Sequence, residues 1–291
     1  MGVVRPMNGI LVINKPTGIS SHDCVNIIRK AMKTKKVGHA GTLDVEASGV
    51  LVLGINKGTK LLNYLNQDDK TYRFDVVFGI TTDTLDHAGA ITDEQPLQSP
   101  PDIDAALPKF IGTYTQMPPA YSAVKVGGKK LYEYAREGKP IPEVNARDLT
   151  VHELYRTTPV VFDEGRATCG FYLRASKGIY VRQLASDLAE TLGTVAHTTA
   201  IHRVAAGDFT IDEAIDLDHV NANTPLISLA NALRSMPEKQ VAGDDLFKAK
   251  HGQPLRINAD VAQLKIVDER GKLVAIYERK ETDYRAKNVF A

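Results

Sequence analysis

The sequence predicts an α+β fold in two domains, and three observations carry that prediction. Residues 71–79 (TYRFDVVFG) alternate between apolar and polar side chains, which is the period of a β-strand with one buried face. Residues 180–192 repeat valine and leucine at helical spacing. From about residue 240 the chain changes to short strands and turns. We therefore expect a large domain over residues 1–238 and a small β domain over residues 239–291.

The first part of the large domain is predicted to contain a strand, a helix and a second strand. Residues 9–14 (GILVIN) predict a short buried strand that ends at a proline and glycine turn. Ser20 or Ser21 can cap the helix that follows, because a serine hydroxyl accepts from the free backbone N–H groups of a first turn. Five glycines over residues 38–58 surround the apolar run 49–55, which indicates a loop leading into a buried strand.

The second part of the large domain carries an expected insertion. A proline-rich loop precedes a short helix at about residues 102–108. Residues 120–156 then combine a Gly127-Gly128 turn, a basic and aromatic stretch and a strand at about 147–156. We interpret this region as inserted into the domain, and residues 166–175 as a strand that returns to it.

Composition and cysteine usage exclude several classes of protein. The longest apolar run, residues 49–55, is far below the roughly 18 residues of a membrane span, and the N-terminus has no basic stretch followed by an apolar core. Cys24 and Cys169 match neither a metal-ligand spacing nor a disulfide framework. These patterns predict a cytoplasmic protein with buried, reduced thiols, no metal site and no membrane partner.

Basic residues form clusters, although the net charge is only +1. Phosphate binding needs local groups of lysine and arginine, whereas a single cluster is more often the solvated face of a helix. The clusters consist of Arg29, Lys30, Lys33, Lys35 and Lys36; Lys125, Lys129 and Lys130; and Lys248, Lys250, His251 and Arg256.

The most informative segment is residues 38–54 (GHAGTLDVEASGVLVLG), which places Asp44 in a glycine-rich loop. By itself, an aspartate in such a loop is more often a turn residue or a helix cap than a catalyst. The functional alternative is a carboxylate on a close-packed loop where glycine lets a ligand approach.

Five segments, in order between residue 9 and about residue 210, resemble the motifs of the TruB family of tRNA pseudouridine synthases. They are Asn14-Lys15-Pro16-Thr17-Gly18; Gly38 to Asp44 with Ala47 to Leu51; Lys70-Thr71-Tyr72 with Thr82-Asp83-Thr84; Gln116-Met117-Pro118-Pro119 with Tyr121-Ser122-Ala123; and Ser176-Lys177-Gly178 with Tyr180-Val181-Arg182. Departures from the family pattern occur at Val45-Glu46, Ala175 and His202, and they bear on loop stiffness and on fine RNA contacts.

The resemblance implies a pseudouridine synthase fold, with a mixed, largely antiparallel sheet and flanking helices. It implies a substrate, the uridine of the tRNA TΨC stem-loop usually numbered 55, and Asp44 as the catalytic carboxylate. Arg182 is expected to keep Asp44 ionised by opposite charge; without the motif, Arg182 would be taken for a surface ion pair. The isomerisation needs no metal, redox cofactor or nucleotide.

The resemblance also implies a binding pocket for a flipped base. Tyr72 is expected to stack on the uracil and His39 to fill the vacated stack. Tyr180 resembles the second tyrosine of the family pocket, Ile201 its apolar wall, and Lys15 a support of the catalytic loop. From pattern alone, Tyr72 is one more core aromatic and His39 a bystander.

Two further parts of the chain are expected to bind RNA. The insertion at about residues 125–150 suits a mobile thumb, although an amphipathic hairpin would have the same pattern. Its candidate contacts are Lys125, Lys129, Lys130 and Arg136, which alternate with Tyr132 and Tyr134. The C-terminal segment resembles a PUA domain, a small β-barrel of RNA-modifying enzymes.

Three rival functions remain open on the sequence. Dyskerin-type synthases share the catalytic motifs but act with guide RNA and partner proteins, whereas the long insertion favours a stand-alone enzyme with no obligatory protein partner. A non-catalytic tRNA-binding or tRNA-folding protein could use the same pocket. A hydrolase that cuts the glycosidic bond would need a second carboxylate, and Glu46 is too near Asp44 in a tight loop to be assumed its partner.

Overall fold

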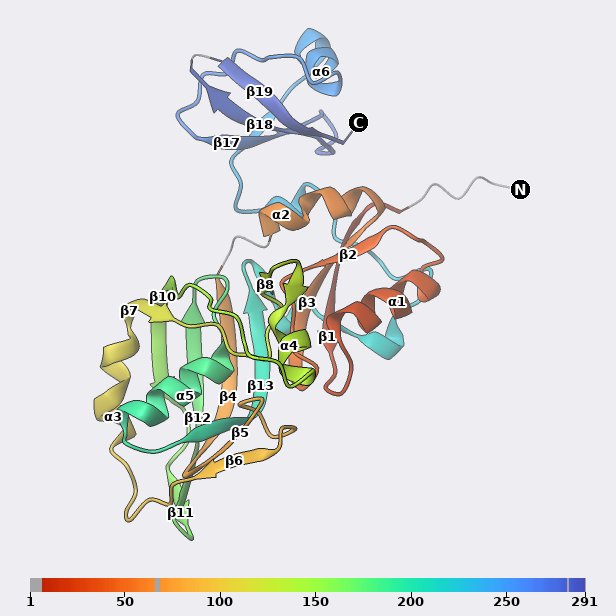
Figure 1. Cartoon of the computed structure of the whole chain (residues 1–291). Coiled ribbons are helices and arrows are strands. Elements are labelled where there is room, and N and C mark those ends of the chain that lie inside the picture. Colours follow the sequence, from red (N-terminus) through yellow and green to blue (C-terminus); the bar gives the residue numbers. More distant parts are fainter. Residues whose placement is uncertain (1–6, 66–68, 282, 291) are drawn as a thin grey trace.

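The large domain is built on one mixed sheet, seen in a computed structural model that describes residues 7–65, 69–281 and 283–290 (Figure 1). Its main path is β15 (Ile215–Asp216), β1 (Gly9–Lys15), β3 (Ala47–Ile55), β13 (Ala196–Ala206), β4 (Lys70–Phe78), β12 (Arg166–Ala175), β10 (Arg147–Arg156) and β7 (Gly112–Gln116). Along this path only β15 with β1 and β3 with β13 pair in parallel. The predicted mixed, largely antiparallel sheet is confirmed.

Shorter elements complete the sheet and its hairpins. β2 (Val37–Ala40), β11 (Val161–Asp163) and β14 (Phe209–Thr210) add to β3, β12 and β13, while β5 (Ile80–Thr82) pairs with β6 (Ile91–Glu94). Short helices α2 (Leu62–Leu65) and α3 (Ile103–Ala106) follow β3 and β6 in the chain.

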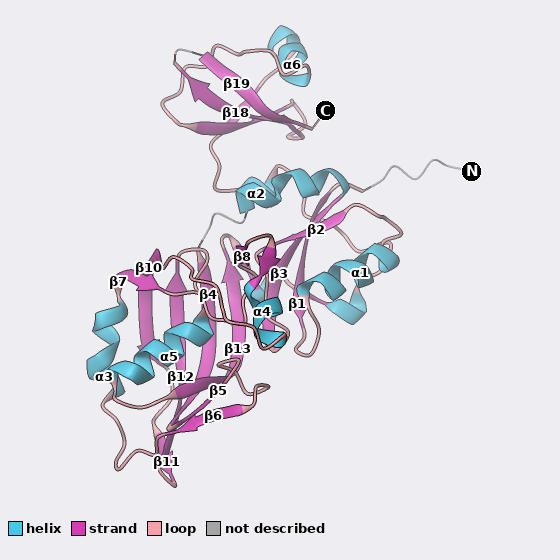
Figure 2. Cartoon of the chain, in the orientation of Figure 1, coloured by secondary structure: helices cyan, strands magenta, loops and turns pink. Residues whose placement is uncertain are grey.

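Two amphipathic helices cover one face of the sheet, α1 (Ser21–Ala31) and α5 (Val181–Thr191) (Figure 2). Leu11 and Ile13 of β1 pack with these helices, whereas Ile10 and Val12 point into a second core on the opposite face. Residues 10–13 of β1 are all apolar, as expected of a strand that is buried on both faces. Ser20 caps α1 as predicted: its hydroxyl accepts from Asp23 N, and the Asp23 carboxylate accepts from Ser20 N.

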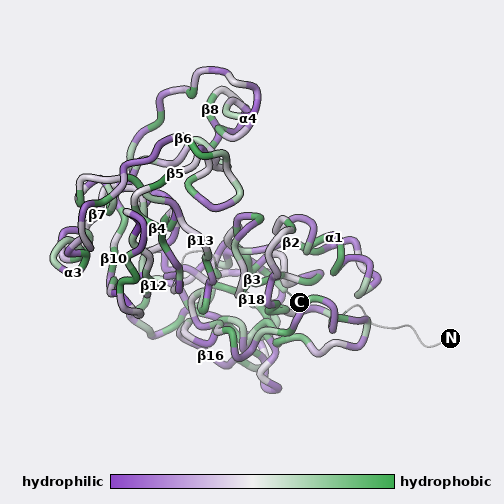
Figure 3. The backbone as a smooth tube through the Cα atoms, turned by 90° about the horizontal axis from the view of Figure 1, so that it is seen from below, coloured by the Kyte–Doolittle hydropathy of each residue, from purple (hydrophilic) through white to green (hydrophobic). Residues whose placement is uncertain are grey.

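The insertion is shorter than expected, because the strand at 147–156 belongs to the main sheet. β10 pairs with both β12 and β7, and its Leu149, Val151 and Leu154 are buried in the core. What projects from the sheet is the hairpin β8 (Lys125–Val126) and β9 (Lys129–Lys130) with α4 (Leu131–Arg136) (Figure 3). The expectation that residues 147–156 form part of the insertion is therefore wrong.

The C-terminal unit is a small sheet with one helix. Its strands pair in the order β16 (Glu238–Gln240), β17 (Gln263–Val267), β18 (Leu273–Lys280) and β19 (Asp283–Val289), and α6 (Gly243–Lys250) packs on β18 and β19. The small β unit is confirmed. Among the described residues the four strands pair in a single line, and an isolated antiparallel bridge joins Leu255 to Tyr284 of β19.

The C-terminal unit shares a core with the large domain. Phe290 and Ile276 lie in one buried cluster with Val50 and Val52 of β3, the strand that follows the Asp44 loop. Lys57 Nζ donates to Phe290 O at 2.7 Å. The two units are therefore packed as one body at this junction.

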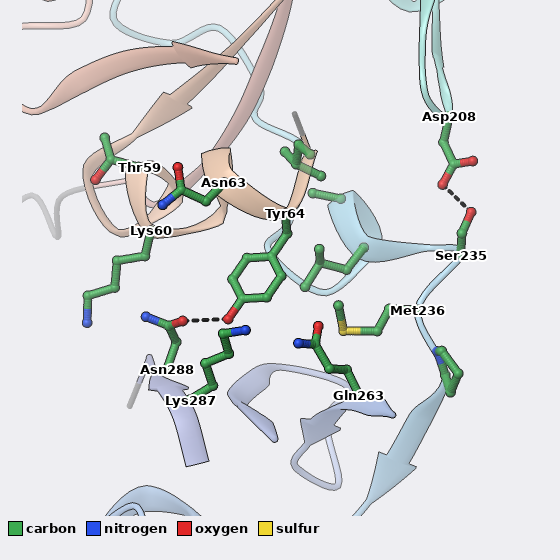
Figure 4. A pocket seen from close by; sticks show the side chains of 14 residues that line it. Thr59, Lys60, Asn63, Tyr64, Asp208, Ser235, Met236, Gln263, Lys287 and Asn288 are labelled. Atoms are coloured by element: carbon green, nitrogen blue, oxygen red, sulfur yellow. Dashed lines mark hydrogen bonds between the residues drawn. The ribbon is translucent and has the colours of Figure 1, made fainter. Parts of the chain in front are cut away.

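Polar contacts extend this junction toward a cleft of about 880 Å³. The Tyr64 hydroxyl donates to Asn288 Oδ1 at 2.5 Å, and Lys287 of β19 and Gln263 of β17 also line the cleft (Figure 4). Lys60 Nζ donates to Val289 O at 2.9 Å. The last strand is thus held by side chains of the η1–α2 segment, residues 56–65.

Because of this shared core, Phe290→Ala should lower the free energy of unfolding by about 3–5 kcal/mol. Phe290 is 2% exposed, and its removal leaves a cavity in the buried cluster that it shares with residues of the large domain. Phe247→Ala is the matched control, since that ring is 59% exposed on α6 and its loss should cost no more than about 0.5 kcal/mol. Denaturant unfolding of both variants measures the difference, and equal costs would contradict a shared core.

Candidate active site

The Asp44 loop, residues 41–46 between β2 and β3, forms one wall of a cleft of about 570 Å³. Tyr72 of β4, Ile201 of β13 and Tyr180, the residue that precedes α5, line the same cleft. β13 lies between β3 and β4 in the sheet, so residues distant in sequence meet at one end of three adjacent strands. The structure thus brings four of the sequence-predicted site residues together.

Arg182 holds the Asp44 carboxylate. Its Nε donates to Asp44 Oδ2 at 2.9 Å, its Nη2 donates to Tyr121 O at 3.0 Å, and its Nη1 donates to Thr84 O. The Arg182 side chain is 4% exposed, whereas that of Asp44 is 43% exposed. Because each guanidinium nitrogen has a partner, the arginine is fixed and presents one accessible carboxylate to the cleft.

A second carboxylate approaches the same arginine. Asp86 Oδ2 lies 3.8 Å from Arg182 Nε, and Asp86 Oδ1 accepts from Thr84 Oγ1 and from Ala88 N. The sequence motifs assigned Asp86 no role. Asp86 follows β5 in the chain, and the sequence around it predicts only a turn. Its approach to Arg182 depends on the tertiary fold.

The two tyrosines are held in different ways. Tyr72 is 7% exposed and sits on β4 between Leu173 and Arg203 of the neighbouring strands. The backbone of Tyr180 is clamped by Gln116, whose amide donates to Tyr180 O and accepts from Tyr180 N. Burial raises the pKa of the Tyr180 phenol, so at neutral pH this group stays protonated and can donate a hydrogen bond.

Lys15 and His39 are not among the residues that line the cleft. Lys15 is fully buried, and its Nζ donates to the carbonyl oxygens of Pro16, Ile19 and Val45. Burial lowers the pKa of the Lys15 ammonium group. His39 lies on β2 opposite Leu53, and its buried Nδ1 has no hydrogen-bond partner among the described residues.

His39 is accordingly separate from the four residues that line the cleft. Burial lowers the pKa of its imidazole, which favours the neutral ring.

The basic residues of the insertion are engaged with its aromatic rings. Lys129 Nζ lies over the Tyr134 ring and pairs with Glu137 at 2.5 Å. Lys130 and Arg136 both lie over Tyr132, at 5.3 Å from the ring centroid. Lys125 is exposed on the hairpin. These cations form a separate surface, outside the cleft that contains Asp44.

Other chemical features are few. In the described part of the chain, no group of three or more His, Cys, Asp or Glu side chains is arranged to hold a metal ion. Cys24 and Cys169 are free and buried. Within residues 7–65, 69–281 and 283–290, every helix is too short or too polar to span a lipid bilayer.

Comparison with known proteins identifies the family. Residues 29–181, just over half of the chain, match the model of the TruB family pseudouridylate synthase N-terminal domain. The chain belongs to this family. A protein of Bacillus pumilus named tRNA pseudouridine synthase B is 41% identical over 95% of this chain and 94% of its own length. The Bacillus subtilis protein of the same name is 37% identical over 93% of this chain and 93% of its own length. The Lactobacillus gasseri protein of that name is 37% identical over 96% of this chain and 97% of its own length.

Solved structures show the same fold. A chain from an H/ACA ribonucleoprotein bound to a substrate RNA matches with a TM-score of 0.69 and 20% identity over 97% of this chain and 85% of its own. A chain from a Cbf5–Nop10–Gar1 complex matches with a TM-score of 0.68 and 22% identity, over 97% of this chain and 84% of its own length. The pseudouridine synthase fold predicted from the motifs is therefore confirmed, and the chain is an RNA pseudouridine synthase by family.

Proposed function

We propose that this chain isomerises the T-loop uridine of tRNA to pseudouridine, with Asp44 as the catalytic carboxylate. The observation that carries the proposal is a half-exposed carboxylate, fixed by a buried arginine, at the wall of a cleft that also contains Tyr72 and Tyr180. The relatives that are 37–41% identical over nearly the whole chain are named as tRNA pseudouridine synthases.

The reaction fits these side chains. The bond between uracil N1 and the ribose C1′ breaks, the base rotates, and a bond forms between uracil C5 and C1′, while the proton on C5 is lost and N1 gains one. Atoms and electrons balance without a co-reactant. Asp44, when ionised, can act as the nucleophile or as the base, and the guanidinium of Arg182 orients it.

Access to the uridine requires base flipping, because a base in a folded loop is stacked. Extruding it costs a few kcal/mol. Stacking on an aromatic ring returns about 1–3 kcal/mol, and Tyr72 is the ring on the cleft wall that we assign to this role. Tyr180 and Ile201 then bound the base on its other sides, and the neutral ring of His39 fills the vacated stack.

The rival functions are less favoured by the contacts of the site. A hydrolase would need a second carboxylate in the cleft. Glu46 is turned toward His87, with 3.6 Å between Glu46 Oε2 and His87 Nε2, and Asp86 is not among the residues that line the cleft. A protein that only binds RNA would gain nothing from a buried arginine that holds a carboxylate in the cleft, because a carboxylate repels phosphate. Pseudouridine formation accounts for both features.

We further propose that the insertion and the C-terminal unit bind the RNA, and that the enzyme acts in the cytoplasm without an obligatory protein partner. The cations and rings of α4 support the first part, because aromatic and basic side chains together suit single-stranded or loop RNA. The small C-terminal sheet remains our candidate for a PUA-like module.

If the hairpin contacts phosphate, Lys125→Gln should weaken tRNA binding and flatten its salt dependence. Each lost phosphate contact reduces the slope of log affinity against log salt by about 0.7–0.9. Lys109→Gln is the control, since Lys109 is equally exposed but follows α3 at the far edge of the sheet (Figure 1). Dissociation constants at several salt concentrations test this, and equal slopes for the two variants would remove Lys125 from the interface.

The chemistry is tested by incubating the purified chain with an unmodified tRNA transcript and analysing the nucleosides. We expect pseudouridine to form with no added transition metal, guide RNA or partner protein. Release of free uracil would identify a hydrolase, and binding of tRNA without either product would favour the RNA-binding alternative.

A further inference from the structure

Side chains supply most of the hydrogen bonds to the backbone of the Asp44 loop. Residues 41–46 lie outside the helices and strands, so their carbonyl groups lack ladder partners. Arg203 Nη2 donates to Gly41 O at 2.9 Å and Arg203 Nη1 donates to Thr42 O at 3.3 Å. Two consecutive carbonyls on the N-terminal side of Asp44 therefore accept from one guanidinium.

The rest of the loop is held from other elements. The Ser21 hydroxyl of α1 donates to Leu43 O at 3.0 Å and accepts from Leu43 N at 2.9 Å. On the C-terminal side, Val45 O accepts from Lys15 Nζ and from Gly18 N. Asp44 is thus fixed from both sides, and Arg203 makes the contacts closest to the start of the loop.

Arg203 is itself rigid. It is 1% exposed, it lies on β13 between Gly49 of β3 and Tyr72 of β4, and its Nε donates to Val50 O at 2.8 Å. Gly49 has a φ of +104°, and a Cβ there would lie 2.3 Å from Arg203 O. A residue larger than glycine would push Arg203 away from the loop.

The acceptors of Arg203 explain why an arginine is needed. Every hydrogen bond that Arg203 donates within the described residues goes to a backbone carbonyl, and the three acceptors lie on two segments, residues 41–42 and Val50. A planar fork of five donors can bridge both segments at once, whereas the ammonium group of lysine is a point charge. The guanidinium thus ties the start of the loop to the strand that follows it.

We propose that Arg203 is a positioning residue that sets the distance between Asp44 and the flipped base. The inference rests on the proposed catalytic role of Asp44. A shift of the loop by about 1 Å is enough to slow an aligned reaction on the order of 100-fold. tRNA affinity comes from stacking and phosphate contacts elsewhere, so Arg203 acts on the rate in the bound complex.

The test separates rate from binding and from folding. Arg203→Lys should reduce the single-turnover rate at saturating tRNA by about 100-fold while the tRNA dissociation constant changes by less than about threefold. The variant should fold, because this chain already buries Lys15 and Lys265 against two or three carbonyls each. Lys265→Met is the matched control: it removes a buried, carbonyl-bound cation far from the cleft and should leave the saturated rate of the folded enzyme near that of the wild type.

The outcomes are distinct. A saturated rate for Arg203→Lys within about threefold of the wild type, or a variant that cannot fold at all, would show that Arg203 only supports the core. An equal loss of rate in Lys265→Met would show that general destabilisation is responsible. If Asp44→Asn retains activity, the proposed function itself fails; if Asp44→Asn is inactive and Arg203→Lys is normal, only this inference fails.

Discussion

Asp44→Asn should abolish pseudouridine formation, with a loss of single-turnover rate on the order of 10⁴-fold or more. The amide keeps the shape of the side chain, and its oxygen can still accept the hydrogen bond from Arg182 Nε. What disappears is the negative charge that attack or proton abstraction needs. Because the Asp44 side chain is 43% exposed, the free energy of unfolding should change by no more than about 1 kcal/mol.

The neighbouring acid provides the control for this substitution. Glu46→Gln removes the same charge from the same loop, but Glu46 faces His87 rather than Arg182. We expect this variant to bind tRNA and turn over at rates close to those of the wild type. If Asp44→Asn, well folded, keeps substantial single-turnover activity, Asp44 is not the catalyst and the RNA-binding alternative leads.

Arg182→Met should slow turnover at least about 100-fold and also lower stability. The substitution removes the group that orients Asp44 and leaves the carbonyl oxygens of Thr84 and Tyr121 without their donor. Asp44 can be hydrated because it is half exposed, so most of the cost comes from these carbonyls and from Asp86, and amounts to about 1–3 kcal/mol.

The matched control for Arg182 is another arginine of the same domain. Arg174 pairs with Glu153 at 2.7 Å, but its side chain is 40% exposed, and exposed pairs contribute about 0–1 kcal/mol. Single-turnover rates and melting temperatures should therefore fall for Arg182→Met and hardly change for Arg174→Met. Similar behaviour of the two variants would mean that the Arg182–Asp44 pair contributes no more to turnover than an exposed ion pair does.

Local sequence patterns predicted the elements that depend on residues close together in the chain. The alternation over residues 71–79 became β4, with Tyr72 and Phe74 buried and Arg73 exposed, because a strand turns every second side chain to the same face. The cap at Ser20 followed from the hydrogen-bonding needs of a first helical turn. Such features involve residues only a few positions apart.

Features that depend on distant pairing were missed. Nothing near residues 147–156 indicates that β10 pairs with β7 and β12, so the strand was assigned to the insertion. Likewise, the apolar run at the start of β18 does not reveal that Ile276 shares a buried cluster with residues of the large domain. Pairing and docking of this kind are decided by the whole fold.

The candidate site likewise contains residues that the motifs predict and residues that only the tertiary fold reveals. The motifs pointed to Asp44, Tyr72, Tyr180 and Arg182 through resemblance, and the fold brings their side chains to one cleft and one ion pair. Arg203 was not selected, because arginine is usually a surface residue and its burial arises only when β13 inserts between β3 and β4. A buried cation satisfied by loop carbonyls leaves no signature in the sequence.

The most direct test of the account is to map pseudouridine position by position in tRNA transcripts after incubation with the purified chain. The account predicts a single modified site, the T-loop uridine, in transcripts that carry no other modification and with no guide RNA present. The same transcripts treated with Asp44→Asn should contain none. Pseudouridine at other positions only, or at none, would contradict the central claim.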